Sequence, residues 1–416
     1  MKFERTKSVA AAAIGNVLEW YDFSIYAYAA GTIGRKFFPD ADETASLLAA
    51  FAAFGVGFVV RPIGGIVIGR LGDLRGRKPA LMATVLLMAV GTVGIGILPD
   101  RQTIGTAAPL LLVLCRFIQG FSAGGEWGSS TAFVVEWAPA GRRGFFGSLQ
   151  QASVCGGLLL GSVSAALIDT WLTPDQTDDW GWRIPFLAGG VLAPVGLYLR
   201  RNVGEPPAFR AVRTLPTPLR PGSGWVLAAK ACGFTTLWTV AYYTMLGFIP
   251  TFTQLFVGLG AAQALWSNAA GLLVLMALIP ACGALSDRIG RKPLLLSGCI
   301  GFILLSYPLF LLMVSGATLR VVVLVQMAFA ALIALFSGPG PAAIAEIFPT
   351  SGRSTWMSAG YSVSTAVFGG FAPYVATGLI AVTGSPLAPT YYLIAAALVS
   401  AVVIAGLRES AHDPLA

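Results

Sequence analysis

The sequence predicts an all-α integral membrane protein whose twelve transmembrane helices form two six-helix bundles. Three observations predict this fold. The 416 residues are 56% hydrophobic and only 11% charged, with a mean hydropathy of +0.75. The hydrophobic residues fall into twelve segments of spanning length. Two different motifs occur twice along the chain, once in each half.

The composition indicates that lipid surrounds most of the protein. Soluble domains are about 45–50% apolar and about 25% charged, and a soluble fold with so few charges would expose a large apolar surface to water. An ordinary soluble enzyme and a disordered chain are therefore both excluded. The 50 glycines agree with helices that pack closely in lipid.

Twelve apolar segments account for most of the chain. The first follows a basic start, contains Glu19 and Asp22, and has no clear cleavage site, so we expect it to be retained as a span. The predicted spans are 10–31, 45–69, 80–98, 106–135, 145–169, 183–201, 225–250, 263–285, 293–314, 319–338, 354–381 and 389–408.

Basic residues predict the orientation of these spans. With the N-terminus in the cytoplasm, the loops on that side hold nineteen Lys and Arg residues and the opposite loops hold five. This positive-inside bias places both termini in the cytoplasm. The net charge of +8 is then a topology signal, and it does not require a nucleic-acid partner.

The longest predicted cytoplasmic connection divides the chain in two. It covers residues 202–224, contains five prolines and three arginines, and is typical of an extended linker. We therefore expect an N-terminal six-helix bundle over residues 1–201 and a C-terminal six-helix bundle over residues 225–416.

Two loop motifs repeat between these halves. The stretch GRLGDLRGRKP at 69–79 returns as GALSDRIGRKP at 283–293, and EWAPAGRR at 136–143 matches EIFPTSGR at 346–353. The two offsets, 214 and 210 residues, are nearly equal. Parallel six-span halves related by an axis along the membrane normal are one of the known plans of secondary transporters.

The repeated loop resembles the motif between the second and third helices of the major facilitator superfamily. Other stretches resemble its metabolite:proton symporter family more narrowly, and together these resemblances cover essentially the whole chain. The first loop copy departs from the pattern at Leu74, where Arg or Lys is expected, and Arg75 follows. The family-like stretches are GNVLEWYDF at 15–23, RPIGG at 61–65, RFIQGFSAGGEWG at 116–128 and GWRIPF at 181–186.

The resemblance implies the major facilitator fold and a secondary active transporter that works by alternating access. Members of the family carry organic acids, or zwitterions such as proline and betaine, together with protons. The zwitterion branch tends to have a long C-terminal coiled-coil tail, whereas this chain stops about eight residues after its last predicted span. We therefore expect proton-coupled symport of a small organic acid anion, a mono-, di- or tricarboxylate. A zwitterionic osmolyte symporter and an exporter of amphipathic compounds are the alternatives.

Charged residues of the repeated loops are predicted to form a cytoplasmic gate. Each copy places an Asp where a helix ends, near loop arginines, and such charge clusters can hold one conformational state and break in the other. A solvated positive-inside loop is the alternative. The candidate gate residues are Asp73, Arg77, Glu136, Arg143, Asp287, Arg291, Glu346 and Arg353.

Three carboxylates inside predicted spans are candidates for proton coupling. Glu19 and Asp22 lie three residues apart on one face of the first helix, and two neighbouring carboxylates in a low dielectric do not both stay charged easily. Glu126 lies in a Gly-rich part of the fourth span, where close helix packing would enclose it. The alternative for each is a structural ion pair with a buried cation such as Arg61.

Buried cations are candidates for substrate binding. Arg116 and Arg61 lie inside spans, and a guanidinium can hold a carboxylate with two parallel hydrogen bonds. Gln119 lies one turn from Arg116. In this superfamily an Arg in the fourth helix also resembles a proton-relay motif, so Arg116 is either an anion ligand or a relay and structural residue. Lys230 lies near the start of the seventh span, where snorkelling to the surface is the alternative.

Aromatic residues recur near the middle of the spans. Tyr242 and Tyr243 in the seventh span are the ones that we expect to reach the cavity, with ordinary packing as the alternative.

No catalytic site, metal site or cofactor is predicted. The five cysteines lie inside apolar segments without a CxxC pair, and the single histidine, His412, lies in the predicted tail. We expect no enzyme activity, with protons as the coupling ion. The expected partners are a small organic anion and the lipid bilayer, with no nucleic acid. The expected form is a monomeric, multi-pass protein of the bacterial inner (plasma) membrane.

Overall fold

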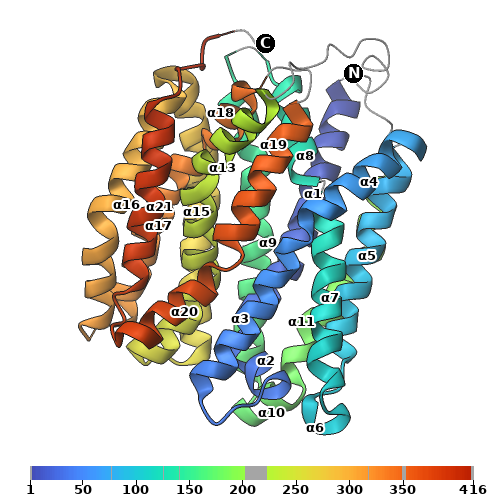
Figure 1. Cartoon of the computed structure of the whole chain (residues 1–416), viewed down its shortest axis with the longest axis vertical. Coiled ribbons are helices and arrows are strands. Elements are labelled where there is room, and N and C mark those ends of the chain that lie inside the picture. Colours follow the sequence, from blue (N-terminus) through green and yellow to red (C-terminus); the bar gives the residue numbers. More distant parts are fainter. Residues whose placement is uncertain are drawn as a thin grey trace.

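The computed structural model describes residues 2–75, 77–124, 126–139, 141–201, 223–316, 318–348 and 353–413. Most helices run along the long axis of the molecule, and both ends of the chain lie at the same end of it (Figure 1). We call this end the termini face. It is the end that the basic loops predict to be cytoplasmic.

The first half of the chain is helical throughout its described spans. Asp42 begins the second predicted span by accepting a hydrogen bond from the Thr44 N–H at 2.9 Å, a standard N-cap. The elements are α1 (Lys2–Tyr28), α2 (Ala30–Phe37), α3 (Glu43–Val59), α4 (Arg61–Arg75), α5 (Arg77–Ile97), α6 (Arg101–Ile104), α7 (Ala107–Ala123), α8 (Glu126–Trp137), α9 (Arg143–Trp171), α10 (Pro174–Asp179), η1 (Gly181–Arg183) and α11 (Ile184–Arg201).

The second half contains longer helices interrupted by π-helical segments. Such segments are rare and occur mostly at functional sites. The elements are α13 (Ser223–Tyr242), η2 (Tyr243–Phe248), α14 (Ile249–Phe252), η3 (Thr253–Val257), α15 (Ala261–Ile289), α16 (Arg291–Val314), α17 (Leu319–Ser337), α18 (Gly340–Ile347), α19 (Arg353–Ser364), η4 (Thr365–Gly369), α20 (Ala372–Thr383) and α21 (Pro389–Ala405).

Every predicted span coincides with one of these helices or with consecutive helices, so the predicted fold class is confirmed. By length and hydropathy alone, six helices of the described residues can cross a membrane. The pair Gly224–Met245 and Ile249–Val257, bent by 45°, makes a seventh. Shorter apolar helices occupy other predicted spans (Met82–Ile97, Ala107–Ala123 and Pro389–Ala405). The division into bundles at 201 and 225 stays a prediction: the described part of the predicted linker is the start of α13, and residues 202–222 lie outside the described residues.

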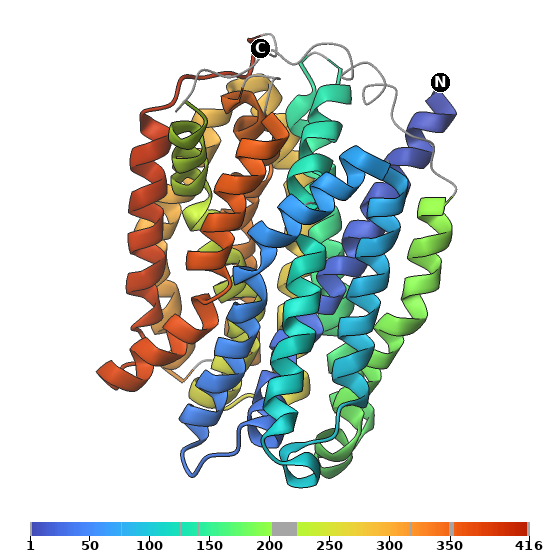
Figure 2. The ribbon, with the colours of Figure 1, turned by 45° about the vertical axis from the view of Figure 1, so that its right-hand side comes forward.

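The two halves of the chain lie side by side, with blue to green helices on one side and mostly yellow to red helices on the other (Figure 2). They meet most extensively along α9 and α15. Small residues permit the close approach, because a Cβ on Gly283 would lie 2.6 Å from the Gly144 carbonyl oxygen. Further along, Ser162 Oγ donates to the Leu265 carbonyl at 2.9 Å.

The sides of the bundle expose large hydrophobic side chains. Leu110, Val191 and Val402 are more than 70% exposed. A soluble protein avoids such a surface, whereas lipid favours it. The helices therefore place their charged residues at the ends of the bundle and in its interior.

Candidate substrate site and gate

An ion pair joins α1 and α4 inside the bundle. Arg61 Nη2 donates to Glu19 Oε1 at 3.2 Å, and the two side chains are 3% and 8% exposed. Arg61 begins α4 directly after the break that ends α3. Pro62 fits there because the first turn of a helix does not need its backbone N–H.

Aromatic rings surround this ion pair. The Arg61 guanidinium carbon lies 4.9 Å from the ring centres of Phe23 and Phe58 and 5.9 Å from that of Trp20. Tyr243, the first residue of η2, packs on Phe58 at 5.1 Å and on Trp20 at 6.0 Å between ring centres. The second half of the chain therefore contributes to the surroundings of a charge pair that belongs to the first half.

A second group of rings crosses between the halves. Trp127 of α8 stacks on Tyr361 of α19 with ring centres 3.7 Å apart and planes inclined by 12°. It also meets Trp238 of α13 edge-on at 5.8 Å. Tyr361 also lies beside Arg61, and this contact joins the two groups of rings. We define the aromatic cage as Trp20, Phe58, Trp127, Trp238, Tyr243 and Tyr361.

Polar atoms in and beside the cage lack hydrogen-bond partners among the described residues. Arg61 Nε and the Tyr243 hydroxyl are buried and unpaired. Buried polar groups nearly always have a partner. Such unpaired atoms therefore indicate where water or a ligand is accommodated.

Arg116 forms a separate polar group in the first half. Its Nη1 donates to Gln119 Oε1 at 2.6 Å and its Nη2 to the Phe54 carbonyl at 3.2 Å. The ring of Tyr26 covers the guanidinium, with its centre 4.5 Å from the guanidinium carbon. Gln119 Nε2 in turn donates to Thr92 Oγ1 at 2.8 Å. Arg116 and Gln119 thus lie together, as their spacing predicts.

The two neighbouring carboxylates of α1 have different surroundings. Glu19 pairs with Arg61, whereas Asp22 lies beside the Thr92 hydroxyl. Asp22 is 6% exposed, and no ion pair of the described residues includes it. The shared helix face predicted a joint site, but the structure pairs Glu19 directly with Arg61 and places Asp22 beside the Thr92 hydroxyl, with Arg116 nearby.

The remaining predicted site residues fall into three groups. Tyr243 is part of the cage and Tyr242 is buried beside it, at 6% and 4% exposed. Lys230 is exposed and does not join the buried group, in agreement with the snorkelling alternative. The side chains of Glu126, Asp73 and Arg77 lie outside the described part of the structure.

Asp287 connects the halves at the termini face. Its Oδ1 and Oδ2 accept the backbone N–H groups of Gly144 and Phe145 at 2.8 and 2.9 Å, so a carboxylate on α15 caps the first turn of α9. Arg291 Nη1 holds the same carboxylate at 2.8 Å. A carboxylate is stabilised at a helix N-terminus by the free N–H groups and the helix dipole.

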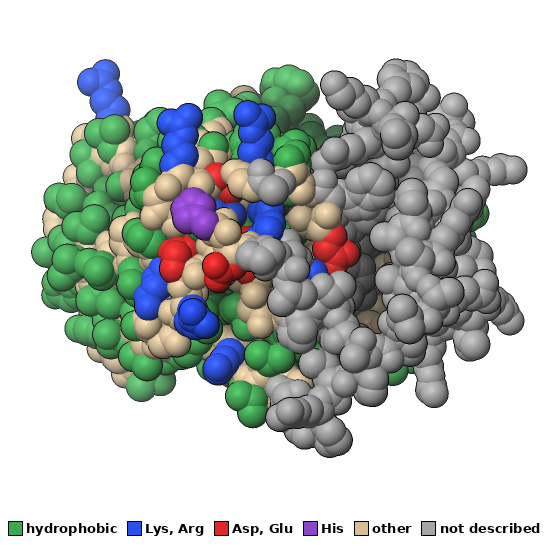
Figure 3. Space-filling model, turned by 90° about the horizontal axis from the view of Figure 1, so that it is seen from above, with side chains coloured by type: hydrophobic (Ala, Val, Ile, Leu, Met, Phe, Trp, Pro, Cys, Tyr) green, Lys and Arg blue, Asp and Glu red, His purple; other side chains and the backbone are tan. Residues whose placement is uncertain are grey.

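The repeated EWAPAGRR-like motifs pair crosswise. Glu136 of the first copy accepts from Arg353 of the second at 2.9 Å, and Arg143 of the first copy donates to Glu346 of the second at 3.3 Å. Arg291 Nη2 lies 3.5 Å from the same Glu346 oxygen. Figure 3 shows basic and acidic side chains gathered on the described part of the termini face.

The tail after α21 completes this charged cluster, and sequence reasoning missed it. Glu409 accepts backbone hydrogen bonds from Arg291, Lys292, Ser410 and Ala411 at 2.9 to 3.1 Å. Burial raises the pKa of Glu409, but these four donors outweigh it and hold the pKa below its ordinary value. The sequence did offer a signal for this contact. An acidic residue directly follows the last predicted span, on the same side of the membrane as a free helix N-terminus.

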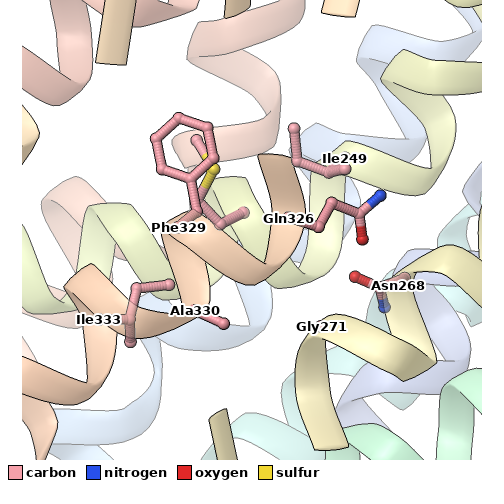
Figure 4. A pocket seen from close by; sticks show the side chains of 8 residues that line it. Ile249, Asn268, Gly271, Gln326, Phe329, Ala330 and Ile333 are labelled. Carbon is pink, nitrogen blue, oxygen red and sulfur yellow. The ribbon is translucent and has the colours of Figure 1, made fainter. Parts of the chain in front are cut away.

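A small pocket lies between α15 and α17, lined mainly by apolar side chains. Asn268 and Gln326 face each other across it (Figure 4). Asn268 Nδ2 also donates to Tyr28 of the first half at 3.0 Å. The space accommodates about one water molecule, so this pocket is too small for an organic substrate.

Sequence comparisons place the chain among transporters. A family model described as Major Facilitator Superfamily matches residues 12–337. The proline/betaine transporter of Escherichia coli (strain K12) is 33% identical over 98% of this chain and 84% of its own length. The glycine betaine/proline/ectoine/pipecolic acid transporter OusA of Dickeya dadantii (strain 3937) is also 33% identical, with the same coverage.

Solved structures agree on the fold. The xylose transporter XylE from E. coli, in a partially occluded inward open conformation, superposes with a TM-score of 0.80 at 18% identity. The match covers 97% of this chain and 98% of that one. Because the family model matches more than three quarters of the sequence and the fold agrees, this chain belongs to the major facilitator superfamily and is a membrane transporter.

Proposed function

We propose that the protein is a proton-coupled symporter of small zwitterions that carry a quaternary or secondary ammonium group, such as betaine and proline. The observation that carries this proposal is the aromatic cage built around the neutralised Glu19–Arg61 pair. Ring faces attract an ammonium group, by about 0.5–2 kcal/mol for each good contact. The stacked rings of Trp127 and Tyr361 come from different halves, so a substrate packed against this pair would contact both.

The charge balance of the site favours a zwitterion over an organic anion. Arg61 already has Glu19 as its counter-ion, so a substrate without net charge leaves the buried site neutral. A di- or tricarboxylate carries a net negative charge, so its binding would need buried cations that have no counter-ion in the protein. Arg116 is the other buried cation of the described residues in this region, and it is engaged by Gln119, the Phe54 carbonyl and aromatic rings. The expectation of a carboxylate substrate therefore becomes the second candidate.

The relatives support the same choice. Proteins named as proline/betaine transporters match nearly the whole chain at 33–35% identity. The tail-length argument that favoured an organic anion carries less weight than a match of this extent. The zwitterion alternative stated from the sequence is thus the better supported one.

We assign the coupling proton to Asp22. A buried carboxylate is costly when charged and not directly paired with a cation. Asp22 has the Thr92 hydroxyl beside it and Arg116 nearby, but no ion pair among the described residues. Glu19, by contrast, is compensated by Arg61. Protonation and substrate binding would then favour the same transition, as symport requires.

Alternating access follows from the positions of the cage and the gate. The conformation described here is closed at the termini face by Asp287 and the crosswise ion pairs. Rocking of the halves would break these contacts and separate the rings of Trp127 and Tyr361. We also propose that the protein works as a monomer in the bacterial inner membrane, with both termini cytoplasmic.

A binding panel tests the substrate class. Purified protein in detergent is heated with glycine betaine, proline, succinate, citrate or 2-oxoglutarate, and the unfolding midpoint is recorded. A true ligand at 100 times its Kd stabilises the folded state by about 2.7 kcal/mol. Betaine and proline are expected to raise the midpoint and the carboxylates to leave it unchanged. Stabilisation by a carboxylate alone would favour the organic-anion candidate instead.

A further inference from the structure

A chain of polar contacts connects two buried charges of the first half, Arg116 and Asp22. Arg116 Nη1 donates to Gln119 Oε1 at 2.6 Å, and Gln119 Nε2 donates to Thr92 Oγ1 at 2.8 Å. The Thr92 hydroxyl in turn lies against the Asp22 carboxylate. Arg116, Gln119 and Thr92 are fully buried, and Asp22 is 6% exposed. We call these four residues the polar chain.

Two glycines allow the members of the polar chain to approach each other. A Cβ built on Gly189 of α11 would lie 2.7 Å from Asp22 Oδ1 and 2.9 Å from Thr92 Cγ2, so the two side chains meet in the space that a larger residue would occupy. A Cβ built on Gly91 of α5 would lie 2.6 Å from Gln119 Cγ. The close packing of α1, α5, α7 and α11 therefore fixes the order of the chain.

Arg116 determines the direction of these hydrogen bonds. A guanidinium has only donors and stays charged in proteins, so the Gln119 amide turns its oxygen toward Arg116 and its nitrogen toward Thr92. The Thr92 oxygen accepts that N–H, which leaves the hydroxyl hydrogen for Asp22. All donors thus point toward Asp22, and the last bond is stronger to a carboxylate than to a neutral carboxylic acid.

Few other groups of the described residues influence Asp22. The charged or titratable side chains that face it are Arg116 from α7 and Tyr21 from its own helix. Tyr21 donates its hydroxyl to the Pro185 carbonyl at 2.9 Å, so that hydrogen is not available to the carboxylate. α5 contributes Thr92, which does not titrate, and α11 contributes a glycine. A change in the charge of Asp22 therefore acts first on Thr92.

From this arrangement we propose that Thr92 is a positioning residue for proton coupling: it directs its hydroxyl hydrogen onto Asp22 and, through Gln119, connects that carboxylate to Arg116. When Asp22 takes up a proton, the last bond of the polar chain weakens, and the Thr92 hydroxyl is released to reorient. The proposal rests on the proposed function, since it concerns the coupling proton assigned to Asp22.

The far end of the polar chain reaches the binding site. Arg116 Nη2 donates to the Phe54 carbonyl of α3 at 3.2 Å. The Phe54 ring packs on Tyr243 of the aromatic cage with ring centres 6.1 Å apart. The polar chain therefore gives the charge of Asp22 a continuous physical connection to a ring of the cage.

The pH dependence of gradient-driven betaine uptake into liposomes tests this role. Thr92→Val keeps the β-branched shape but removes the hydroxyl. The external pH of half-maximal uptake should then rise by about one unit, because a carboxylate that has lost a donor binds its proton more tightly. Thr92→Ser, which keeps the hydroxyl, should retain the wild-type profile. Gln119→Leu removes the donor that orients Thr92 and should shift the profile in the same direction by a smaller amount.

Thr235→Val is the matched control, because Thr235 is also fully buried but donates to the Ala231 carbonyl of its own helix at 2.8 Å. Its pH profile should equal that of the wild type. Exchange of internal for external betaine in the Asp22→Asn background separates positioning from packing. Without the ionisable group, adding Thr92→Val should change the exchange rate by less than about twofold.

Two results would overturn the positioning role of Thr92. One is an unchanged pH profile in both Thr92→Val and Gln119→Leu. The other is an equal slowing of exchange by Thr92→Val with and without Asp22→Asn, which would reduce Thr92 to a packing residue. If the wild-type protein takes up no betaine under a proton gradient, the proposed function itself fails, so the two failures are distinguishable.

Discussion

Arg61 occupies the point where the buried charge of the first half meets aromatic rings from both halves. It pairs with Glu19 and lies over Phe23 and Phe58, while Tyr361 reaches it from the second half. A buried ion pair is costly to desolvate and costlier still to break. Its retention inside a transporter fits a role in binding better than a role in stability.

The ion pair predicts a non-additive effect on stability. Glu19→Gln leaves the Arg61 guanidinium buried without its counter-ion and should lower the free energy of unfolding by about 3–5 kcal/mol. The double variant Glu19→Gln/Arg61→Gln should cost less than the two single variants together. Thermal unfolding of the four proteins measures this. Additive losses would mean that the two side chains do not depend on each other.

The aromatic cage predicts a loss of affinity on removal of a ring. Trp127→Leu removes one ring face while keeping an apolar side chain, and betaine binding should weaken by about 2- to 30-fold, the equivalent of one cation–π contact. Trp171→Leu is the control, since Trp171 is 75% exposed. Equal losses in both variants, measured by calorimetry, would argue against the cage.

Sequence reasoning reached some of these residues and missed others for physical reasons. Glu19, Arg61 and Tyr243 are recognisable because charged residues are rare in spans and the tyrosine lies mid-span. The contact between Trp127 and Tyr361 joins residues more than 200 positions apart, and no local pattern predicts which mid-span rings face each other. Likewise, helix periodicity placed Asp22 beside Glu19 but could not reveal Thr92 on a different helix.

At the scale of elements, the termini face is closed by contacts between helix ends. α15 caps α9 through Asp287, and the two copies of the second motif exchange partners across the halves. The sequence predicted the loop residues of this cluster but not the contribution of Glu409 or the crosswise pairing. A repeat shows that two loops are alike, whereas the pairing depends on how the halves face each other.

The cap on α9 predicts a local change in hydrogen exchange. Asp287→Asn removes the charge that accepts the Gly144 and Phe145 N–H groups, and exchange at these amides should become at least about tenfold faster. Hydrogen–deuterium exchange with mass spectrometry resolves this turn. Asp175→Asn, at an exposed position of α10, is the matched control. Unchanged protection of the α9 turn would show that the cap does not hold the halves together.

The tail contact predicts a change in proteolysis. Glu409 binds the first turn of α16, so Glu409→Gln should release the segment that follows α21 and speed trypsin cleavage after Arg408 by about tenfold. Asp179→Asn, at the opposite end of the molecule, serves as the control. Equal cleavage rates in the wild type and Glu409→Gln would mean that the tail is held by other contacts, such as Ser410 on Glu346.

At the scale of the whole molecule, the spans were predictable because lipid imposes a length and a composition on each of them. The gaps between helices were harder to predict. In the sequence, α3 and α4 form one apolar stretch, but in the structure they separate at Val60. The π-helical segments η2 and η4 widen helices that the sequence predicts to be continuous. These irregular points adjoin the cage, where binding geometry constrains the backbone more than hydropathy does.

Transport by purified protein in liposomes tests the central claim most directly. With the interior made alkaline, labelled glycine betaine should accumulate above its external concentration, and an uncoupler should abolish the accumulation. Asp22→Asn should lose this gradient-driven uptake while still exchanging internal for external betaine. Accumulation of citrate or 2-oxoglutarate in place of betaine, or betaine uptake indifferent to the proton gradient, would contradict a zwitterion:proton symporter.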